Sequence, residues 1–422
     1  MVKFKEILSN RNFFFLWLGQ IVSQFGDRLN QMALIALISA RFPGSTFQLA
    51  KVLSFTILPV LFVGPLAASY VDRWDRRKTM IFCDFLRAVL VGSVALIFVK
   101  SDNLIPVYAI IFIIFSAGRF FVPAKMSIIP ELVSKEKLLL ANSLSSITGM
   151  IAVVAGFGLG GIIVERIGPE GGFLIDALTY VVSGIFIFMI VASATAYSRG
   201  SATGSAAFNM QRLLKKTVLA DIKEGWQYFA QDRDIRFVAG MVFLLGAGVG
   251  AVSVVIVVFI QDTFGSITQD LGVFSMFLGV GLFCGSLIYG RFGQGLSKMR
   301  VIFISLGATG MILGVFTLFL RILAPASFTY ALSLLLGLSI SPIIISAQTL
   351  VHQITDQKMR GRIFGSLDIV AYTAFFLFML LSSFLAERVE RFWILLLVSI
   401  IFTIVGFGAI ILRLDKKRLA DV

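Results

Sequence analysis

The sequence predicts an all-α membrane protein with twelve transmembrane helices in two six-helix bundles. The chain has 422 residues, of which 58% are hydrophobic and only 14% are charged, whereas a soluble domain carries about 25% charged residues. Apolar runs recur along the chain, and each reaches the roughly 20 residues that a spanning helix needs. A polar stretch at about 194–233 divides these runs into two equal sets.

The apolar runs are too long and too continuous for a β-barrel, whose strands alternate weakly over about ten residues. Several runs exceed about 25 residues, and we expect those helices to be tilted or to extend beyond the bilayer. The predicted spans are 12–40, 47–71, 79–100, 104–129, 138–165, 170–193, 234–261, 270–292, 300–321, 327–350, 362–386 and 391–413.

Basic residues predict the orientation of these spans, because Lys and Arg gather in cytoplasmic loops. Lys3 and Lys5 precede the first span, and Lys416 and Lys417 follow the last one. An even number of spans places both termini in the cytoplasm, so the chain is predicted to be a multi-pass protein of the cell inner (cytoplasmic) membrane. The net charge of +14 is then explained by the Lys and Arg residues of the cytoplasmic loops. We therefore expect no nucleic-acid partner.

The polar stretch sets the predicted domains: an N-terminal bundle at 1–193, a cytoplasmic linker at 194–233 and a C-terminal bundle at 234–422. The first part of the linker is small and polar, as in flexible linkers. The second part repeats apolar residues at helical spacing, which favours an amphipathic helix on the cytoplasmic face. A solvated connector is the alternative.

Residues 64–78 read GPLAASYVDRWDRRK and place a dense charge cluster between two apolar runs. The spacing resembles the loop between helices 2 and 3 of major facilitator superfamily transporters, G-x-L-a-D-R-x-G-R-K, with Ala68 and Asp75 in place of two glycines. The DRWDRR form is similar to the branch of enterobactin exporters and macrolide efflux proteins, and more distantly to lysophospholipid transporters. An ordinary positive-inside loop is the alternative.

The resemblance implies the major facilitator fold, in which two six-helix halves surround a cavity that opens alternately to each side. It also implies that Asp72 of this loop meets the start of the eleventh span near Asp368 and latches the two halves together. The residues expected in this gating device are Asp72, Arg73, Asp75, Arg76, Arg77 and Asp368.

The first span carries a polar stripe, because Gln20, Gln24, Asp27 and Gln31 are spaced to share one helical face, with Asn30 beside them. Polar groups at this depth face a protein interior or a watery cavity. The resemblance favours a cavity for substrate and protons, since the first span lines it in the family. A packing seam between helices is the alternative.

Other candidates lie in the third to sixth spans. Arg119 interrupts the fourth span, and we hypothesise that it faces the cavity and pairs with Asp27 when no substrate is bound. Asp84 and Arg87 lie three residues apart and predict a structural pair within one helix, and a structural role is favoured for Asp176.

A glycine-rich run in the fifth span resembles the G-P-x-x-G-G element of antiporters, with Phe157 replacing the proline. Small residues of this kind let helices approach closely. Its members are Gly156, Gly160 and Gly161.

The predicted function is secondary active export of amphipathic small molecules of the drug, macrolide or siderophore type, by proton antiport. Export follows from the resemblance. Proton coupling follows from Asp27, because an acid in a low-dielectric interior binds a proton more readily. No enzyme constellation and no phosphate-binding G-x-x-x-x-G-K-[ST] motif occurs, so we expect no enzyme, no cofactor and no metal.

The expected partners are a small-molecule substrate, protons and the lipid bilayer, and we expect a monomer. Two alternatives stay open. One is a lysophospholipid transporter or flippase of the same fold, with Arg119 at the headgroup. The other is a sensor that binds a ligand without transporting it.

Overall fold

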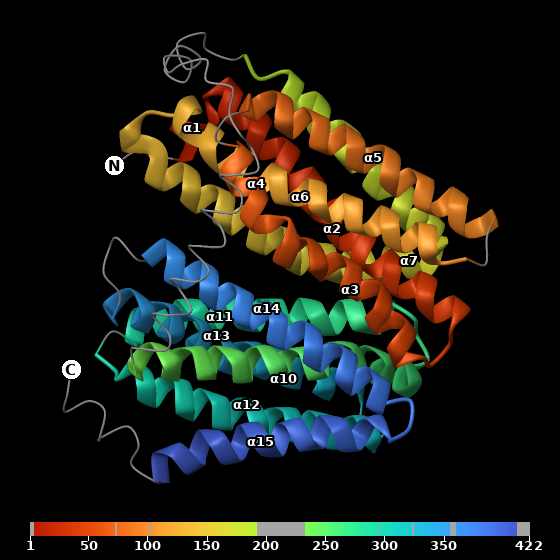
Figure 1. The fold of residues 1–422 in the computed structure, drawn as a ribbon, viewed down its shortest axis with the longest axis vertical. Helices are drawn as coiled ribbons and strands as arrows, with labels where there is room; N and C mark the ends of the chain where they lie inside the picture. The colour runs from red at the N-terminus through yellow and green to blue at the C-terminus, as the bar shows by residue number, and fades with distance from the viewer. Residues whose placement is uncertain are drawn as a thin grey trace, which may run out of the picture. The chain divides into compact units, whose positions relative to one another are not determined.

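The computed structural model describes residues 4–71, 74–100, 103–191, 233–293, 295–322, 325–354 and 360–411, and every regular element in them is a helix (Figure 1). The helices of the first part of the chain are α1 (Phe4–Leu8), α2 (Arg11–Arg41), α3 (Thr46–Phe62), α4 (Gly64–Val71), α5 (Arg76–Lys100), α6 (Ile105–Leu132), the 3₁₀ turn η1 (Lys135–Lys137) and α7 (Leu138–Phe188). Those of the second part are α10 (Arg233–Phe264), α11 (Gln269–Phe292), α12 (Lys298–Arg321), α13 (Ala326–Ile354), α14 (Arg360–Leu385) and α15 (Arg391–Ile411).

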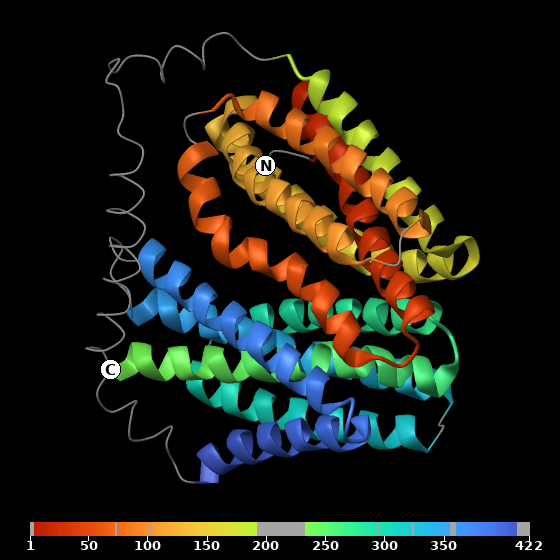
Figure 2. The ribbon, with the colours of Figure 1, turned by 45° about the vertical axis from the view of Figure 1, so that its right-hand side comes forward.

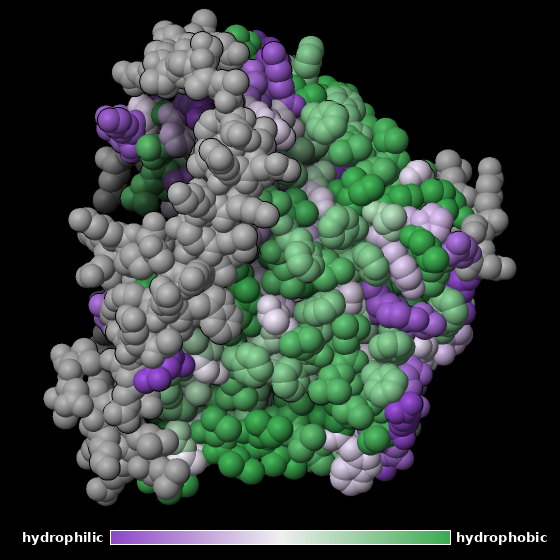
Figure 3. Space-filling view, viewed as in Figure 1, coloured by the Kyte–Doolittle hydropathy of each residue, from purple (hydrophilic) through white to green (hydrophobic). Residues whose placement is uncertain are grey.

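The described helices have the length and composition of membrane spans. Eight helical stretches in the described residues are long and apolar enough to cross a bilayer, and the shorter apolar helix Thr46–Phe62 accompanies them. Figure 3 shows apolar side chains over much of the visible surface. Large apolar side chains of the described residues reach high exposed fractions, and that of Leu139 is 81%. Exposed apolar surface of this extent is expected where lipid replaces water as the solvent.

Helix α7 holds two of the predicted spans, because the chain reverses inside it. Gly168 has φ +78°, outside the helical region, and Pro169 follows it. Glycine adopts this conformation without a steric penalty, and proline suits the first turn of the next helix. We name residues 138–167 the first arm of α7 and residues 169–188 the second arm, and Figures 1 and 2 show the two arms running in opposite directions.

The predicted span at 47–71 is wrong as a single helix. The structure ends α3 at Phe62 and begins α4 at Gly64. Pro59 lies inside α3 and Pro65 lies in the first turn of α4. Because proline lacks an N–H group and its ring crowds the preceding turn, two prolines this close interrupt the helical hydrogen bonding and break the span.

The chain forms two compact units, Met1–Leu37 with Val52–Val218, and Ile38–Lys51 with Leu219–Val422. We name them unit 1 and unit 2. In unit 1, α5 packs on α6 and α7, and α4 packs on α6. The predicted boundaries at 193 and 234 stay a prediction, and the predicted amphipathic helix lies outside the described residues.

Unit 2 is built from helix pairs, in which α10 packs on α14, α11 on α13 and α12 on α15. Glycines bring the backbones of these pairs together. A β-carbon on Gly281 of α11 would overlap the Leu334 carbonyl oxygen of α13, and one on Gly337 would lie 2.6 Å from the backbone nitrogen of Leu282. Close backbone approach through small residues is a principal source of stability between helices in lipid.

Candidate functional site

Helix α2 packs against both arms of α7. The Trp17 indole N–H donates to Thr148 Oγ1 of the first arm at 2.8 Å. The Asn30 amide donates to Asp176 Oδ2 of the second arm at 2.7 Å. Gly26 permits this approach, since a β-carbon there would overlap Thr179 Oγ1 and Asp176 Oδ1. The polar stripe of α2 is therefore placed against polar groups of α7 by close helix packing.

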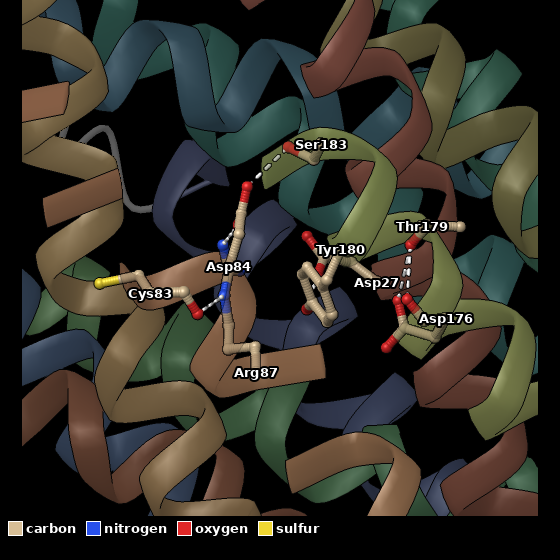
Figure 4. A network of polar contacts seen from close by, with 8 residues as sticks. All are labelled: Asp27, Cys83, Asp84, Arg87, Asp176, Thr179, Tyr180 and Ser183. Carbon is tan, nitrogen blue, oxygen red and sulfur yellow. Dashed lines mark hydrogen bonds and ion pairs between the residues drawn. The ribbon is translucent and has the colours of Figure 1, made fainter. Parts of the chain in front are cut away.

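The centre of this packing is a cluster of acids, which Figure 4 shows from close by. Asp27 is partly exposed and accepts a hydrogen bond from the Tyr180 hydroxyl. Asp176 is completely buried and accepts bonds from Asn30 and from Thr179 Oγ1, the latter at 3.2 Å. Two carboxylates, one from α2 and one from α7, thus lie near each other where these helices pack.

Helix α5 adds a third acid and a cation to the cluster. Asp84 and Arg87 form a buried ion pair within the helix, which confirms the predicted structural pair. Ser183 of α7 donates to Asp84 Oδ2 at 2.7 Å. The Arg87 guanidinium lies 4.3 Å from the centre of the Tyr180 ring, a favourable cation–π distance. Tyr180 therefore joins the Arg87 pair to Asp27 (Figure 4).

The N-terminal part of the predicted stripe lines a small cavity. Gln20 and Gln24 line it together with Lys125 of α6 and Thr148 of α7, and its volume is about 10 Å³. Gln20 is 7% exposed, and its Nε2 atom has no hydrogen-bond partner among the described residues. A cavity of this size has room for about one water molecule, which an orphaned amide would hold.

The predicted pair of Asp27 and Arg119 does not form in this structure. Asp27 accepts from Tyr180 instead, and Arg119 Nε is buried without a hydrogen-bond partner in the described part of the chain. The prediction is wrong for this structure, because the need of a buried arginine for an acid does not specify which helix supplies that acid. Gln31 of the same stripe accepts a bond from Arg28 at 3.1 Å, so its contact is within α2.

The glycine-rich run lies where the first arm of α7 meets α2. A β-carbon on Gly156 would lie 2.8 Å from Arg28 Cβ, and one on Gly160 would lie 3.6 Å from the Leu29 backbone. Gly156, Gly160 and Gly161 are all buried. The run thus provides close helix packing, and its antiporter role stays a prediction.

Charged residues of the predicted gating loop make contacts inside unit 1. Asp75 Oδ1 accepts from the Lys78 N–H at 2.9 Å and caps the start of α5. Arg76 pairs with Glu131 at the end of α6, and Arg77 donates to the carbonyls of Ile187 and Phe188 at the end of α7. These bonds hold three helix ends together at one surface.

The predicted latch between Asp72 and the start of α14 stays a prediction. Asp72 and Arg73 lie outside the described residues. Asp368 is exposed on α14, and the contacts of the charged loop that the structure describes are those of Asp75, Arg76 and Arg77 within unit 1.

An apolar groove runs along unit 1 between α5 and α6. Its volume is about 700 Å³, and Phe82, Leu86 and Ile113 are among the apolar residues that line it. Trp74 lines it too and stacks on Phe120, with ring centres 5.7 Å apart. Asp75 and Lys78 lie at the α5 end of this lining. An apolar groove with charged groups at one end suits an amphipathic molecule.

Tyr180, Ser183 and Thr179 are site residues that the sequence analysis did not single out. Asp176, Tyr180 and Ser183 are spaced by four and three residues, so one face of the second arm of α7 carries all three. The same spacing identified the stripe of α2 and would have identified this face. Within the described residues, no three His, Cys, Asp or Glu side chains are placed to hold a metal ion.

Unit 2 has a polar clasp at the connection between α14 and α15, which holds residues 44–47. Glu387 accepts from the Phe47 N–H and from the Ser45 hydroxyl, each at 2.9 Å. Arg391 donates to the Gly44 carbonyl and pairs with Asp262. Partial burial raises the pKa of Glu387, but these hydrogen bonds and the nearby Arg391 outweigh it, so the pKa lies below its usual value.

Glu387→Gln is expected to release this clasp. A hydrogen bond to a charged group contributes about 1.5 kcal/mol or more, so amide exchange of residues 44–51 should accelerate roughly tenfold. Because the folded pKa is lowered, the contribution is full above the ordinary pKa of glutamate and is lost as the pH falls through the folded value. Hydrogen–deuterium exchange by mass spectrometry, corrected for intrinsic rates, measures both effects.

Glu390→Gln is the matched control, because Glu390 lies in the same connection and pairs with Arg321 at 3.6 Å. It should leave the exchange of residues 44–51 unchanged. Equal exchange in the wild type and in Glu387→Gln would show that Glu387 does not hold the segment.

Comparison with known proteins agrees with this architecture. The family model described as Major Facilitator Superfamily matches residues 16–377. The chain is 26% identical over 368 residues to the uncharacterized MFS-type transporter YkuC of Bacillus subtilis, covering 86% of this chain and 83% of that protein. It is 26% identical to the multidrug efflux pump Tap of Mycolicibacterium fortuitum, covering 90% of each.

Further matches cover part of the sequence or the fold alone. The putative bacilysin exporter BacE of Bacillus subtilis is 28% identical over 176 residues, 42% of this chain and 43% of that protein. Among solved structures, the nucleoside transporter NupG has a TM-score of 0.71 at 14% identity, covering 94% of this chain and 97% of its own. A bacterial homologue of the iron transporter ferroportin in its inward-facing state has a TM-score of 0.70 at 16% identity, covering 94% and 98%.

Proposed function

The chain belongs to the Major Facilitator Superfamily, and from this premise we propose that it exports amphipathic small molecules by proton antiport. The chain is a multi-pass membrane transporter of small-molecule substrates, and its relatives are transporters and not enzymes. Names among those relatives support efflux, since Tap is called a multidrug efflux pump and BacE a putative bacilysin exporter.

Twelve spans follow when the helices are assigned to the bilayer. The two arms of α7 count separately, α3 and α4 together form one span, and α2 and α5 join the apolar helices of the rest of the chain. In this proposal both termini lie in the cytoplasm, the protein resides in the bacterial inner membrane as a monomer, and the linker at 194–233 separates the bundles.

The acid cluster of unit 1 is the observation that carries proton coupling. Asp27, Asp84 and Asp176 come from three helices that the proposal places across the bilayer. A charged side chain in the bilayer interior costs at least about 2.5–3.5 kcal/mol. Asp27 is the partly exposed member. We assign to Asp27 the exchange of protons with solvent, because a coupling acid must reach both the interior and water.

The groove between α5 and α6 supports an amphipathic substrate. Its apolar lining consists of residues of α5 and α6. Phe82 is one of them, and its side chain is 67% exposed. A molecule that partitions into lipid would reach such a groove from the bilayer. The latch of Asp72 with the start of α14 would then couple the two halves during the transport cycle, with Asp368 nearby.

Transport in proteoliposomes tests the proposal. A hydrophobic cationic dye is expected to accumulate under an imposed proton gradient, and Asp27→Asn should abolish the accumulation. One coupled charge moved through 100 mV corresponds to about 2.3 kcal/mol, a roughly 50-fold accumulation ratio. Glu390→Gln, a surface neutralisation in unit 2, is the matched control and should retain full accumulation.

Other outcomes would redirect the proposal. Movement of a labelled lysophospholipid without dependence on a gradient would indicate the lipid transporter, with Arg119 as the headgroup site. Saturable dye binding without flux in any gradient would indicate a sensor. Dye accumulation that is unaffected by collapse of the proton gradient would contradict proton coupling while leaving export intact.

A further inference from the structure

Asp176 differs from the other acids of the cluster in the groups that surround its carboxylate. Its side chain is completely buried in the second arm of α7. The groups that donate to its carboxylate are the neutral Asn30 amide and the neutral Thr179 hydroxyl. No ion pair of Asp176 occurs in the part of the chain that the structure describes.

The charges that surround Asp176 leave an excess of negative charge. Asp27 faces it from α2, and Asp84 and Arg87 lie on α5. Lys125 of α6 lies within electrostatic range of Asp27 and Arg87. Three carboxylates among these described residues therefore meet two cations. A proton on one carboxylate removes the excess, and an interior of low dielectric favours that neutral state.

The contacts of the three acids indicate which one holds this proton. Asp84 contacts the Arg87 guanidinium and accepts from Ser183, which stabilises its charged form. Asp27 accepts from Tyr180, whose ring lies against Arg87, and it is partly exposed to solvent. Asp176 has neither a cation in contact nor access to water, so its carboxylate is the least stabilised as an anion.

The partner of Asp176 suits both protonation states. An asparagine amide carries a donor on its nitrogen and an acceptor on its oxygen. A charged Asp176 accepts from the Asn30 nitrogen, and a neutral Asp176 donates its proton to the Asn30 oxygen after the amide turns over. Gly26 closes the space beside Asp176, because any β-carbon there would overlap its Oδ1 atom. The close packing at Gly26 keeps water away from Asp176. Asn30 can hydrogen-bond to Asp176 in either protonation state.

We propose that Asp176 is a second proton-binding site of this transporter and holds a proton in the resting protein. The site comprises Asp176 with Asn30 and Thr179, and its ligand is a single proton. Its role in transport rests on the proposed proton coupling, whereas its occupancy is a property of the folded protein. Asp176 supplies a store of one proton beside Asp27, the acid that exchanges with solvent.

Infrared spectroscopy of the purified protein at neutral pH tests the occupancy directly. A protonated carboxylic acid has a carbonyl-stretch band separate from those of carboxylates and amides. The band is expected in the wild type, absent in Asp176→Asn, retained in Asp27→Asn and shifted in Asp176→Glu. Absence of the band in the wild type, or its persistence in Asp176→Asn, would overturn the proposal.

Transport supplies the second arm of the test. Asp176→Asn resembles the protonated acid permanently, so gradient-driven dye accumulation should fall by up to roughly 50-fold, the ratio for one charge at 100 mV. Exchange of dye between equal concentrations should persist. A Glu390→Gln variant changes a surface acid of unit 2 outside the site, so it should retain the infrared band and the accumulation. Wild-type protein that shows the band but no transport would refute the proposed function and leave the proton site standing.

Discussion

Asp84→Leu is expected to lower the free energy of unfolding by about 3–5 kcal/mol, because it leaves the buried Arg87 guanidinium without its counter-charge. Asp84 is completely buried and Arg87 is 6% exposed. An arginine in this position stays protonated at any accessible pH, so it cannot relieve the loss by becoming neutral. Thermal or denaturant unfolding of the detergent-solubilised protein measures the effect.

The double variant Asp84→Leu/Arg87→Met sharpens this expectation. Apolar residues of similar volume often replace a buried ion pair without loss of stability, so the double variant should recover most of the stability that the single variant loses. Ser183→Ala removes one hydrogen bond to the same carboxylate and should cost about 1 kcal/mol. A double variant as unstable as Asp84→Leu would show that the charge imbalance is not the cause.

Gly281→Ala should disrupt the packing of α11 on α13 in unit 2. The added β-carbon would overlap the Leu334 carbonyl oxygen and lie 3.0 Å from the Gly337 α-carbon. These are backbone atoms within helices, so relief requires the helices to separate. Overpacking of a well-packed interior costs about 1–3 kcal/mol of unfolding free energy. Because the neighbouring atoms here belong to rigid helices, we expect a loss of about 3 kcal/mol or more. The unfolding midpoint and the yield of monodisperse protein measure the loss.

Gly290→Ala is the control on the same helix. No atom lies within 4 Å of a β-carbon at Gly290, and alanine favours a helix over glycine by up to about 1 kcal/mol. This variant should match or exceed the wild type in stability. Equal behaviour of Gly281→Ala and Gly290→Ala would show that α11 and α13 do not pack as closely as described.

The apolar runs predicted the positions of most helices, because length and hydropathy are local properties of the sequence. The ends of α10, α11 and α12 lie within a few residues of the predicted spans. The break between α3 and α4 was missed although Pro59 and Pro65 were visible, since an apolar run with two prolines satisfies the same length rule. How the chain divides into units depends on long-range packing, which a local pattern does not encode.

The candidate site was predicted in part. Helical spacing correctly paired Asp84 with Arg87, because that prediction concerns one helix. The role of the polar stripe of α2 as a cavity lining stays a prediction. The partner of Asp27 is Tyr180 of α7, not Arg119. That choice depends on how closely α2 and α7 approach, which Gly26 permits and which only the packed structure reveals.

The reversal at Gly168 has a consequence for how the protein is made. The connection at Gly168 and Pro169 is short, although charged residues flank it at Glu165, Arg166 and Glu170, so we expect both arms of α7 to enter the bilayer together as a hairpin. The second arm carries Asp176, which opposes insertion of an isolated helix. Its partner Asn30 lies on α2, which is synthesised earlier. Because α2 is synthesised before α7, Asn30 is already present when the hairpin inserts and can bind Asp176. A chain that lacked α2 would insert the second arm with no hydrogen-bond partner from Asn30.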